Sequence, residues 1–456
     1  MAAVLPLMGI LVTVGAGYLL VKRYNTVMVL LFAGIIMLLL AMAGGLTTFL
    51  PKNVAPSGFI LFDLFKLMQS ISARQLTGVG FIIMTAGGFA TYMDTIGAAD
   101  SLVRLASHPL KYVKSPYIVL ALAYILGQIL VMVVPSAAGL AMLLLVLLHP
   151  ILISVGVSPA ASGAVIATTA GLPMGPATGT AILAAKTADL EPVVYFVQYQ
   201  LPLAIPAIAA AAITHYFVQR YFDKKNIDVY DTPQDAKKKD AKEAPALYAL
   251  FPIAPIVLLI ALSPMVIKGY KLDTVTALMF VWLIAVLVEL IRWRNPKKVL
   301  SDAMSFFKSM GSVFTSIVVL IIAAEMFAAG LRATGLITVL INSAQGAGFG
   351  LGLMSIVLTL IVGIITFLTG SGVGAFSSFA ALAPEVAKGM GGSVTLLINP
   401  MQFAGGLFRA FSPVAGVVIA VSGAVGITPM ALVRRTFPPM IVATIVMIVC
   451  NFIFGG

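Results

Sequence analysis

The amino-acid sequence predicts an all-α polytopic membrane protein, and two observations carry that prediction. Of the 456 residues, 61% are hydrophobic and only 10% are charged, and the mean hydropathy is +1.08. This composition is typical of integral membrane proteins and argues against a soluble multidomain protein. Apolar runs of about 20 residues recur with Lys/Arg clusters between them, which indicates transmembrane helices rather than the short alternating strands of a barrel.

Spans are expected along the whole chain. The first apolar run is followed by Lys22 and Arg23 and lacks a basic segment before it, so we interpret it as a span rather than a signal peptide. The expected spans lie roughly at 4–21, 26–48, 78–96, 162–186, 201–221, 246–264, 273–291, 311–331, 395–423 and 437–454.

Two further apolar segments, 116–155 and 349–390, do not fit a single span. Each is long enough for two short helices, and each is interrupted near its middle by turn-forming residues, "VPSAAG" at 134–139 and "TGSGVG" at 369–374. We expect both segments to be re-entrant hairpins.

The charges predict orientation and exclude several partners. If the polar linker 222–245 is cytoplasmic, most basic residues that flank spans, among them Arg434 and Arg435, lie on the same side, and both termini lie outside the cytoplasm. The net charge of +12 therefore reports topology rather than affinity for nucleic acid. One cysteine, Cys450, and three scattered histidines favour neither a disulfide nor a metal site.

The two halves of the chain, 1–221 and 246–456, are expected to repeat. An odd number of spans separates equivalent points, so the second half should cross the membrane upside down, as in many secondary transporters. Matching residues are separated by 234 to 238 positions, and they are Gly97 with Gly335, Pro150 with Pro384, Glu191 and Pro192 with Thr428 and Pro429, and Pro202 with Pro438 or Pro439.

Such a repeat predicts a binding site formed by two hairpin tips and two interrupted helices. The broken helices are expected at 162–186, where Pro173 and Pro176 remove amide donors, and at 395–423, broken at Pro413. Helix N-termini favour anions. Small residues such as Gly370 and Gly372 allow close approach to that backbone. Hydroxyls that could bind carboxylate or sodium are those of Ser136, Thr178, Thr180, Thr369, Ser371 and Ser412.

Three charged residues within spans carry separate hypotheses. Arg409 lies in a broken span and could grip a carboxylate with two hydrogen bonds, while the alternative is an internal ion pair with Glu325. Glu325 lies in mid-span and is the candidate for carrying a coupling proton. Asp94 lies near the end of its span, where solvation of the helix end is the favoured role.

The sequence resembles the DcuC family of anaerobic C4-dicarboxylate carriers, within the ion transporter superfamily. The resemblance covers nearly the whole chain, and its most specific segments are "GFATYMDTIGAADSLVRLASHPLKYVKSPY" at 88–117, "AITHYFVQRYFDKK" at 212–225, "TGSG" at 369–372 and "SPVAGVVIAVSG" at 412–423. It implies transport of succinate, fumarate or malate across the bacterial inner membrane. It also implies a homodimer with a scaffold domain and a transport domain that moves as an elevator.

By position, the resemblance places the substrate and cation sites at Ser136, Gly139, Thr178, Gly179, Thr369, Ser371, Arg409 and Ser412. Ala138, Thr180 and Val373 stand where family members tend to have other residues, such as "SSATG", "TSGD" and "TGSGNAPF". Fewer polar groups at these positions favour a smaller or less charged organic acid.

The leading hypothesis is a secondary carrier of organic anions driven by a proton or sodium gradient. Within transport, the alternatives are a cation/proton antiporter and a carrier of a different small carboxylate or an amino acid. A channel would need a continuous polar pore. An intramembrane enzyme would need a catalytic pair, but Ser371 has no identifiable His or Lys partner and no HExxH motif occurs.

Overall fold

The computed structural model describes residues 4–22, 24–46, 48–51, 53–113, 115–225, 244–262, 267, 272–346 and 348–455. Within these residues the regular structure is helical and no strand occurs, which confirms the all-α prediction. Helices that are long and apolar enough to cross a membrane are Thr26–Ala43, Ile60–Thr95, Pro192–Lys225, Thr274–Trp293, Pro296–Ala333, Leu351–Thr369 and Pro429–Phe454. The chain is therefore a multi-pass membrane protein.

Many helices begin at residues that satisfy their first amide groups. Asn25, Asp273 and Thr428 cap their helices by accepting hydrogen bonds from backbone N–H groups two or three residues into the helix. Pro296 and Pro429 occupy the first helical position, where the missing N–H has no intrahelical partner to lose.

Two long helices extend furthest beyond the spans that the sequence patterns predict. The first joins α3 (Ile60–Gln75), the π-helical η1 (Leu76–Gly80) and α4 (Phe81–Thr95), whereas the expected span was 78–96. The second joins α15 (Pro296–Val313), η5 (Phe314–Val318) and α16 (Val319–Ala333), whereas the expected span was 311–331. Their N-terminal halves carry charges such as Asp63 and Lys298 among the apolar residues, so hydropathy alone did not include them.

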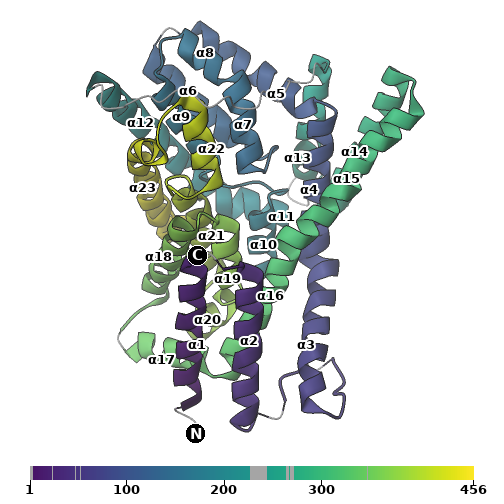
Figure 1. The fold of residues 1–456 in the computed structure, drawn as a ribbon, viewed down its shortest axis with the longest axis vertical. Coiled ribbons are helices and arrows are strands. Elements are labelled where there is room, and N and C mark those ends of the chain that lie inside the picture. The colour runs from purple at the N-terminus through teal and green to yellow at the C-terminus, as the bar shows by residue number, and fades with distance from the viewer. Residues whose placement is uncertain are drawn as a thin grey trace.

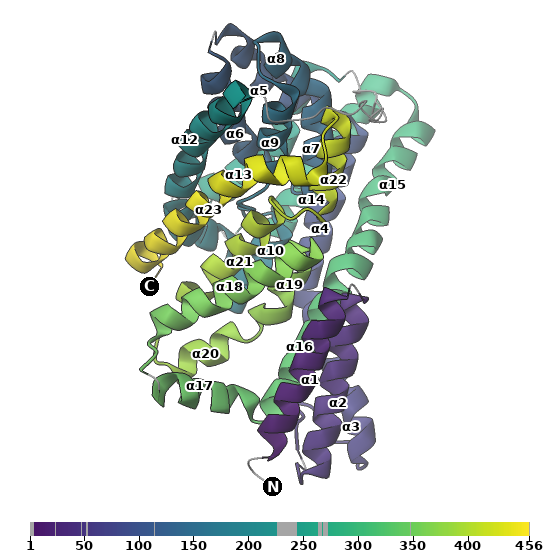
Figure 2. The ribbon, with the colours of Figure 1, turned by 60° about the vertical axis from the view of Figure 1, so that its left-hand side comes forward.

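These long helices pack with α1 (Val4–Val21), α2 (Thr26–Ala43) and α14 (Thr274–Trp293) into what we call the long-helix unit. Figures 1 and 2 show α1, α2, α3 and α16 gathered at the lower end of the molecule, with α4 beside α15 above them. Two clusters of buried apolar side chains hold the lower helices together. At Gly34 of α2 the backbone of α16 comes so close that a Cβ atom would lie 2.5 Å from the Met326 carbonyl oxygen.

The remaining helices are mostly short, and we call the main group of them the broken-helix unit. Its members are α6 (Pro116–Leu130), α7 (Ala137–Leu147), α8 (His149–Ser154), α9 (Pro159–Thr168), α10 (Gly179–Thr187), α11 (Pro192–Val194), η3 (Tyr195–Gln200), α12 (Leu201–Lys225), α18 (Leu351–Thr369), α19 (Gly372–Ala380), α20 (Ala383–Gly389), α21 (Val394–Arg409), α22 (Gly416–Val425) and α23 (Pro429–Phe454). The connecting helices are α5 (Ala98–Ser107), η2 (His108–Tyr112), η4 (Ala246–Ala249), α13 (Leu250–Ala261) and α17 (Leu336–Gly346).

The largest cluster of buried apolar side chains fills the broken-helix unit and continues onto α4, α14 and α15. Chain interruptions at 169–178 and 410–415 therefore lie inside packed protein. Irregular backbone at such positions is tolerated where protein or a water-filled cavity surrounds it.

One charge expected to mark topology has a different environment. Arg435 is 1% exposed and pairs with Asp223 at 2.8 Å, joining α23 to α12, so it is a buried structural ion pair rather than a solvent-facing flank. Its neighbour Arg434 is exposed.

Of the expected linker 222–245, residues 226–243 lie outside the described part of the chain, and α12 continues to Lys225.

Candidate functional site

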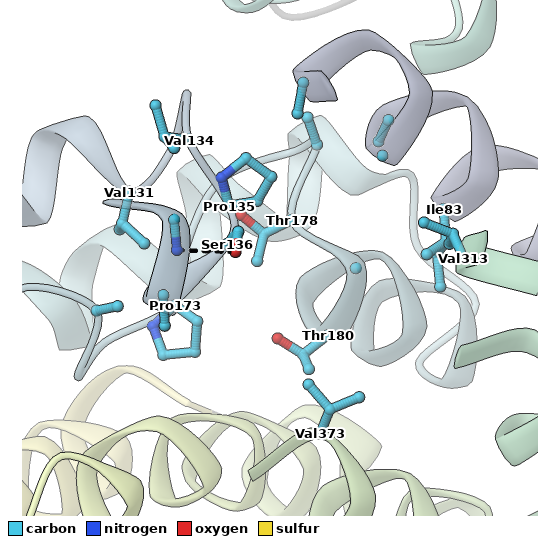
Figure 3. Close-up of a pocket in the computed structure, with 18 of the residues that line it drawn as sticks. Ile83, Val131, Val134, Pro135, Ser136, Pro173, Thr178, Thr180, Val313 and Val373 are labelled. Atoms are coloured by element: carbon cyan, nitrogen blue, oxygen red, sulfur yellow. Dashed lines mark hydrogen bonds between the residues drawn. The ribbon is translucent and has the colours of Figure 1, made fainter. Parts of the chain in front are cut away.

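A cavity of about 500 Å³ lies between the long-helix unit and the broken-helix unit. Figure 3 shows Ile83 and Val313 of the long-helix unit on one side, with Val131 and Pro173 of the broken-helix unit on the other. Ligand pockets occur preferentially between structural units, so this cavity is the leading candidate for a binding site.

One wall is a stripe along α4 and α15. Residues 83, 86, 87, 90, 91 and 94 line the cavity with the spacing of one helix face, a length of about 16 Å at 1.5 Å per residue. Exposure rises along this face from Ile83, which is 3% exposed, to the exposed Thr91. The Thr91 and Ser309 hydroxyls lie 2.7 Å apart and tie α4 to α15.

The opposite wall contains the N-termini of α7, α10 and α19. Ser136 caps α7 by accepting a hydrogen bond from the Gly139 N–H at 3.2 Å, which Figure 3 marks. Thr178 and Gly179 begin α10, and Gly372 begins α19, all at the cavity surface. Unpaired N–H groups at helix N-termini carry partial positive charge, so this wall favours an anion.

Beneath the cavity, α21 presents Gln402, Gly405, Gly406 and Arg409, which follow one face of the helix. A Cβ atom at Gly406 would lie 2.3 Å from Pro173 Cδ, so the interrupted segment 169–178 rests directly on this face. The glycines of α21 thus permit the close approach that shapes the cavity.

Arg409 is the one Lys or Arg among the described residues that line this cavity. Its Nη2 donates to the Ala170 carbonyl oxygen at 2.9 Å, and its buried Nε has no hydrogen-bond partner among the described residues. The alternative of an ion pair with Glu325 is wrong in this structure, because Glu325 accepts hydrogen bonds from Arg74 and Gln75.

A buried amide network, missed by the sequence analysis, fixes the interrupted segment. Gly175 has φ +111°, and its N–H donates to Gln200 Oε1 at 3.1 Å. Gln200 Nε2 donates to Gln402 Oε1 at 2.9 Å, and Gln402 Nε2 donates to the Pro173 carbonyl oxygen at 2.5 Å and to Thr180 Oγ1 at 3.2 Å. The two glutamines lie in apolar runs with no motif to mark them.

The second predicted tip does not line this cavity as a whole. Gly372 reaches it, but Thr369, Gly370 and Ser371 do not. The tip packs on the second interrupted segment: a Cβ atom at Gly370 would lie 2.8 Å from the Val414 carbonyl oxygen.

The hydroxyls near this second tip already have partners. Ser412 donates to the Phe367 carbonyl oxygen at 2.6 Å, and Thr369 donates to the Ile365 carbonyl oxygen at 2.7 Å. Ser371 caps α19 through the Gly374 N–H.

Glu325 lies in a second, smaller cavity of about 250 Å³. Lys186, Arg332 and Glu385 also line it, and Arg332 pairs with Glu385 at 2.7 Å, which joins α16 to α20. The proton-coupling candidate and the arginine candidate therefore occupy different cavities.

Asp94 shares the main cavity with Arg409, although the sequence favoured a role in helix-end solvation. The structure therefore brings together the predicted Ser136, Gly139, Thr178, Gly179, Thr180, Gly372 and Arg409, and it adds Thr91, Asp94, Ser309 and Gln402.

Within the described residues, no group of three His, Cys, Asp or Glu side chains is arranged to hold a metal ion.

Comparisons with known proteins agree on one family. Residues 6–454 match the model of the DcuC family, described as C4-dicarboxylate anaerobic carrier. The chain is 34% identical to the anaerobic C4-dicarboxylate transporter DcuC of Escherichia coli K12, covering 98% of this chain and 95% of that protein. It is 36% identical to the probable anaerobic C4-dicarboxylate transporter DcuC of Vibrio cholerae, covering 97% and 96%.

The crystal structure of the Alcanivorax borkumensis YdaH transporter shares the fold, with 16% sequence identity, a TM-score of 0.64 and coverage of 94% of this chain and 98% of that chain. Matches to a carrier family over nearly the full length group the chain with transporters rather than enzymes. The protein belongs to the DcuC family of C4-dicarboxylate anaerobic carriers.

Proposed function

We propose that this protein is a secondary active transporter of C4-dicarboxylates such as succinate, fumarate and malate in the bacterial inner membrane. Membership of a family of C4-dicarboxylate carriers supports the substrate class. The observation that carries the proposal is the position of Arg409, the single Lys or Arg among the described residues that line the cavity, in the same cavity as the N-termini of α7, α10 and α19. One carboxylate would bind the guanidinium and the other would bind that wall.

Alternating access would arise from motion of the broken-helix unit against the long-helix unit, as in an elevator. Both halves of the chain contain a long helix with a π-helical turn, then a pair of helices joined by a short turn, then an interrupted helix. This common order supports the proposal of two inverted repeats, which is the architecture of many secondary transporters. A homodimer through α2 and α14 would hold the long-helix unit still.

Coupling to a proton or sodium gradient completes the proposed cycle. Glu325 is the proton candidate, and Ser136, Thr180 and Ser371 are the sodium candidates. Of the three sodium candidates, Ser136 and Thr180 line the main cavity. Glu325 lines the second cavity, so proton coupling through Glu325 would act from there.

A carrier of a less charged acid or an amino acid is the second candidate. Asp94 on the cavity wall favours it, because a carboxylate there repels the far end of a dianion and attracts an ammonium group. The apolar Val373 beside Thr180 favours it as well (Figure 3).

Binding measurements on the purified protein test the site. We expect succinate to bind the wild type and Arg409→Ala to weaken binding at least about tenfold, since a hydrogen bond to a charged group contributes roughly 1.5–3 kcal/mol. Arg220→Ala is the matched control, because Arg220 is exposed on α12 and contacts Tyr216 within its own helix. Unchanged affinity in Arg409→Ala would contradict the site, and binding of amino acids but not succinate would favour the second candidate.

A further inference from the structure

The amide network around the cavity has only one consistent direction of hydrogen bonding. Gly175 N–H can only donate, so it must face the oxygen of the Gln200 side chain. The Pro173 carbonyl can only accept, so it must face the nitrogen of the Gln402 side chain. Rotating either glutamine amide by 180° would place donor against donor or acceptor against acceptor. The Gly175 N–H at one end and the Pro173 carbonyl at the other therefore fix the direction of every hydrogen bond between them.

This direction determines the role of the Thr180 hydroxyl. The Gln402 amide nitrogen lies 3.2 Å from Thr180 Oγ1 and has no lone pair to accept with, so Thr180 must accept at this contact. No other hydrogen bond of the Thr180 side chain occurs among the described residues. Its own hydrogen therefore remains for a partner, and Thr180 lines the cavity.

The network is buried and shares one face of α21 with Arg409. Gln200 is 0% exposed and Gln402 is 1% exposed, so these bonds form in a low-dielectric environment where they are stronger than in water. Gln402 and Arg409 are seven residues apart on one face of α21, about 10 Å along the axis, and helical side chains lean toward the N-terminus. The Arg409 side chain thus leans toward the end of the cavity that holds Thr180.

We propose that Thr180 is a specificity-determining residue that donates a hydrogen bond to an anionic ligand, and that Gln402 is the positioning residue that orients it. This inference rests on the proposed function. It assigns Thr180 to the carboxylate remote from Arg409. Gln402 occupies one lone pair of the Thr180 hydroxyl, so a sodium ion could use only the second lone pair, whereas an anion would take the hydrogen, and this favours the anion role of Thr180 over its role as a sodium candidate. Both N–H groups of Gln402 are occupied, so Gln402 acts through Thr180.

The test compares variants of Thr180 in succinate binding and uptake by the full chain. Thr180→Val should raise the succinate dissociation constant about ten- to hundredfold, the usual weight of a hydrogen bond to a charged group, while Thr180→Ser retains the donor and stays near wild type. If sodium drives uptake, the sodium concentration for half-maximal uptake should not change. Thr214→Val is the matched control, because within the described part of the chain the Thr214 hydroxyl bonds only the Ala210 carbonyl of its own helix.

Gln402 is tested by a double-mutant cycle. Gln402→Leu should weaken succinate binding, and adding Thr180→Val should cause little further loss, because both changes remove the same donated bond. Gln402→Glu should weaken binding more, since a carboxylate accepts the Thr180 hydrogen and turns it away from the ligand.

Four results separate the possible failures. A Thr180→Val protein that binds succinate normally overturns the inference, as does one that loses sodium dependence while keeping succinate affinity. Additive losses in the double variant overturn the role of Gln402. Failure of the wild type to bind any dicarboxylate would instead contradict the proposed function itself.

Discussion

The absence of a Cβ atom at Gly372 allows two helices to pack closely at the cavity. A Cβ atom at this position would lie 1.9 Å from the Gly405 carbonyl oxygen, so α19 and α21 meet backbone to backbone. Real Cβ contacts are never this short, and backbone atoms cannot move aside as a flexible side chain can. The start of α19 therefore depends on glycine for its place at the cavity wall.

We predict that Gly372→Ala destabilises the protein by roughly 1–3 kcal/mol, the usual cost of an overpacked site, and reduces succinate binding. Gly311→Ala is the control, because nothing lies within 4 Å of a Cβ at that helical position. Thermal unfolding of the purified variants in detergent measures stability, and the rise in melting temperature on adding succinate measures binding. Equal melting temperatures for the two variants would contradict the close approach.

The residues of the site could be predicted from sequence in part. Arg409 was identifiable because a charge in a broken span is rare and costly. Gln402 and Gln200 were not, because uncharged amides in apolar runs carry no pattern that separates a cavity network from ordinary packing. Ser412 was expected at the site, yet its hydroxyl is used by the Phe367 carbonyl.

At the scale of elements, α12 and α23 are joined through a buried charge. Arg435 of α23 donates to Gln219 at 2.9 Å and to Asp223 at 2.8 Å, both on α12. Sequence alone placed Arg434 and Arg435 together as flanking charges, because helical rotation between neighbours cannot be resolved without knowing which face is packed. The breaks at proline and the tight turns were easier to predict, since they depend on local chemistry.

The two neighbouring arginines provide a matched test. Arg435→Ala should destabilise the protein by roughly 3–5 kcal/mol, because it leaves the charge of the largely buried Asp223 without its cationic partner. Arg434→Ala should change stability by less than about 0.5 kcal/mol, since Arg434 is exposed. Unfolding curves of the two variants in the same detergent measure this difference in stability. An Arg435→Ala variant as stable as the wild type would contradict the buried ion pair.

Over the whole molecule, the two units meet along the line that contains both cavities. A Cβ atom at Gly179 of α10 would lie 3.2 Å from Ile83 Cγ2 of α4, so this contact bridges the units. The all-α class could be predicted from composition, but the lengths of the long helices could not. Their amphipathic halves, such as 60–75, bury one face against neighbouring helices and fall below the hydropathy of a span.

Motion between the units predicts the effect of a crosslink. In a Cys450→Ser background, the pair Ile83→Cys and Gly179→Cys should form a disulfide that arrests transport, and a reductant should restore it. The control pair Gly9→Cys and Thr334→Cys lies within one part of the long-helix unit, where the Cβ atoms would be 3.2 Å apart, and should leave transport intact when oxidised. Full transport by the crosslinked first pair would contradict relative motion of the two units at this contact.

Uptake of labelled succinate into proteoliposomes holding the purified protein, under an imposed proton or sodium gradient, tests the central claim most directly. The account predicts gradient-driven accumulation by the wild type and by Arg220→Ala, and its loss in Arg409→Ala. The gradient that drives uptake would identify the coupling ion. Absence of succinate accumulation by the wild type under both gradients, or accumulation undiminished by Arg409→Ala, would contradict it.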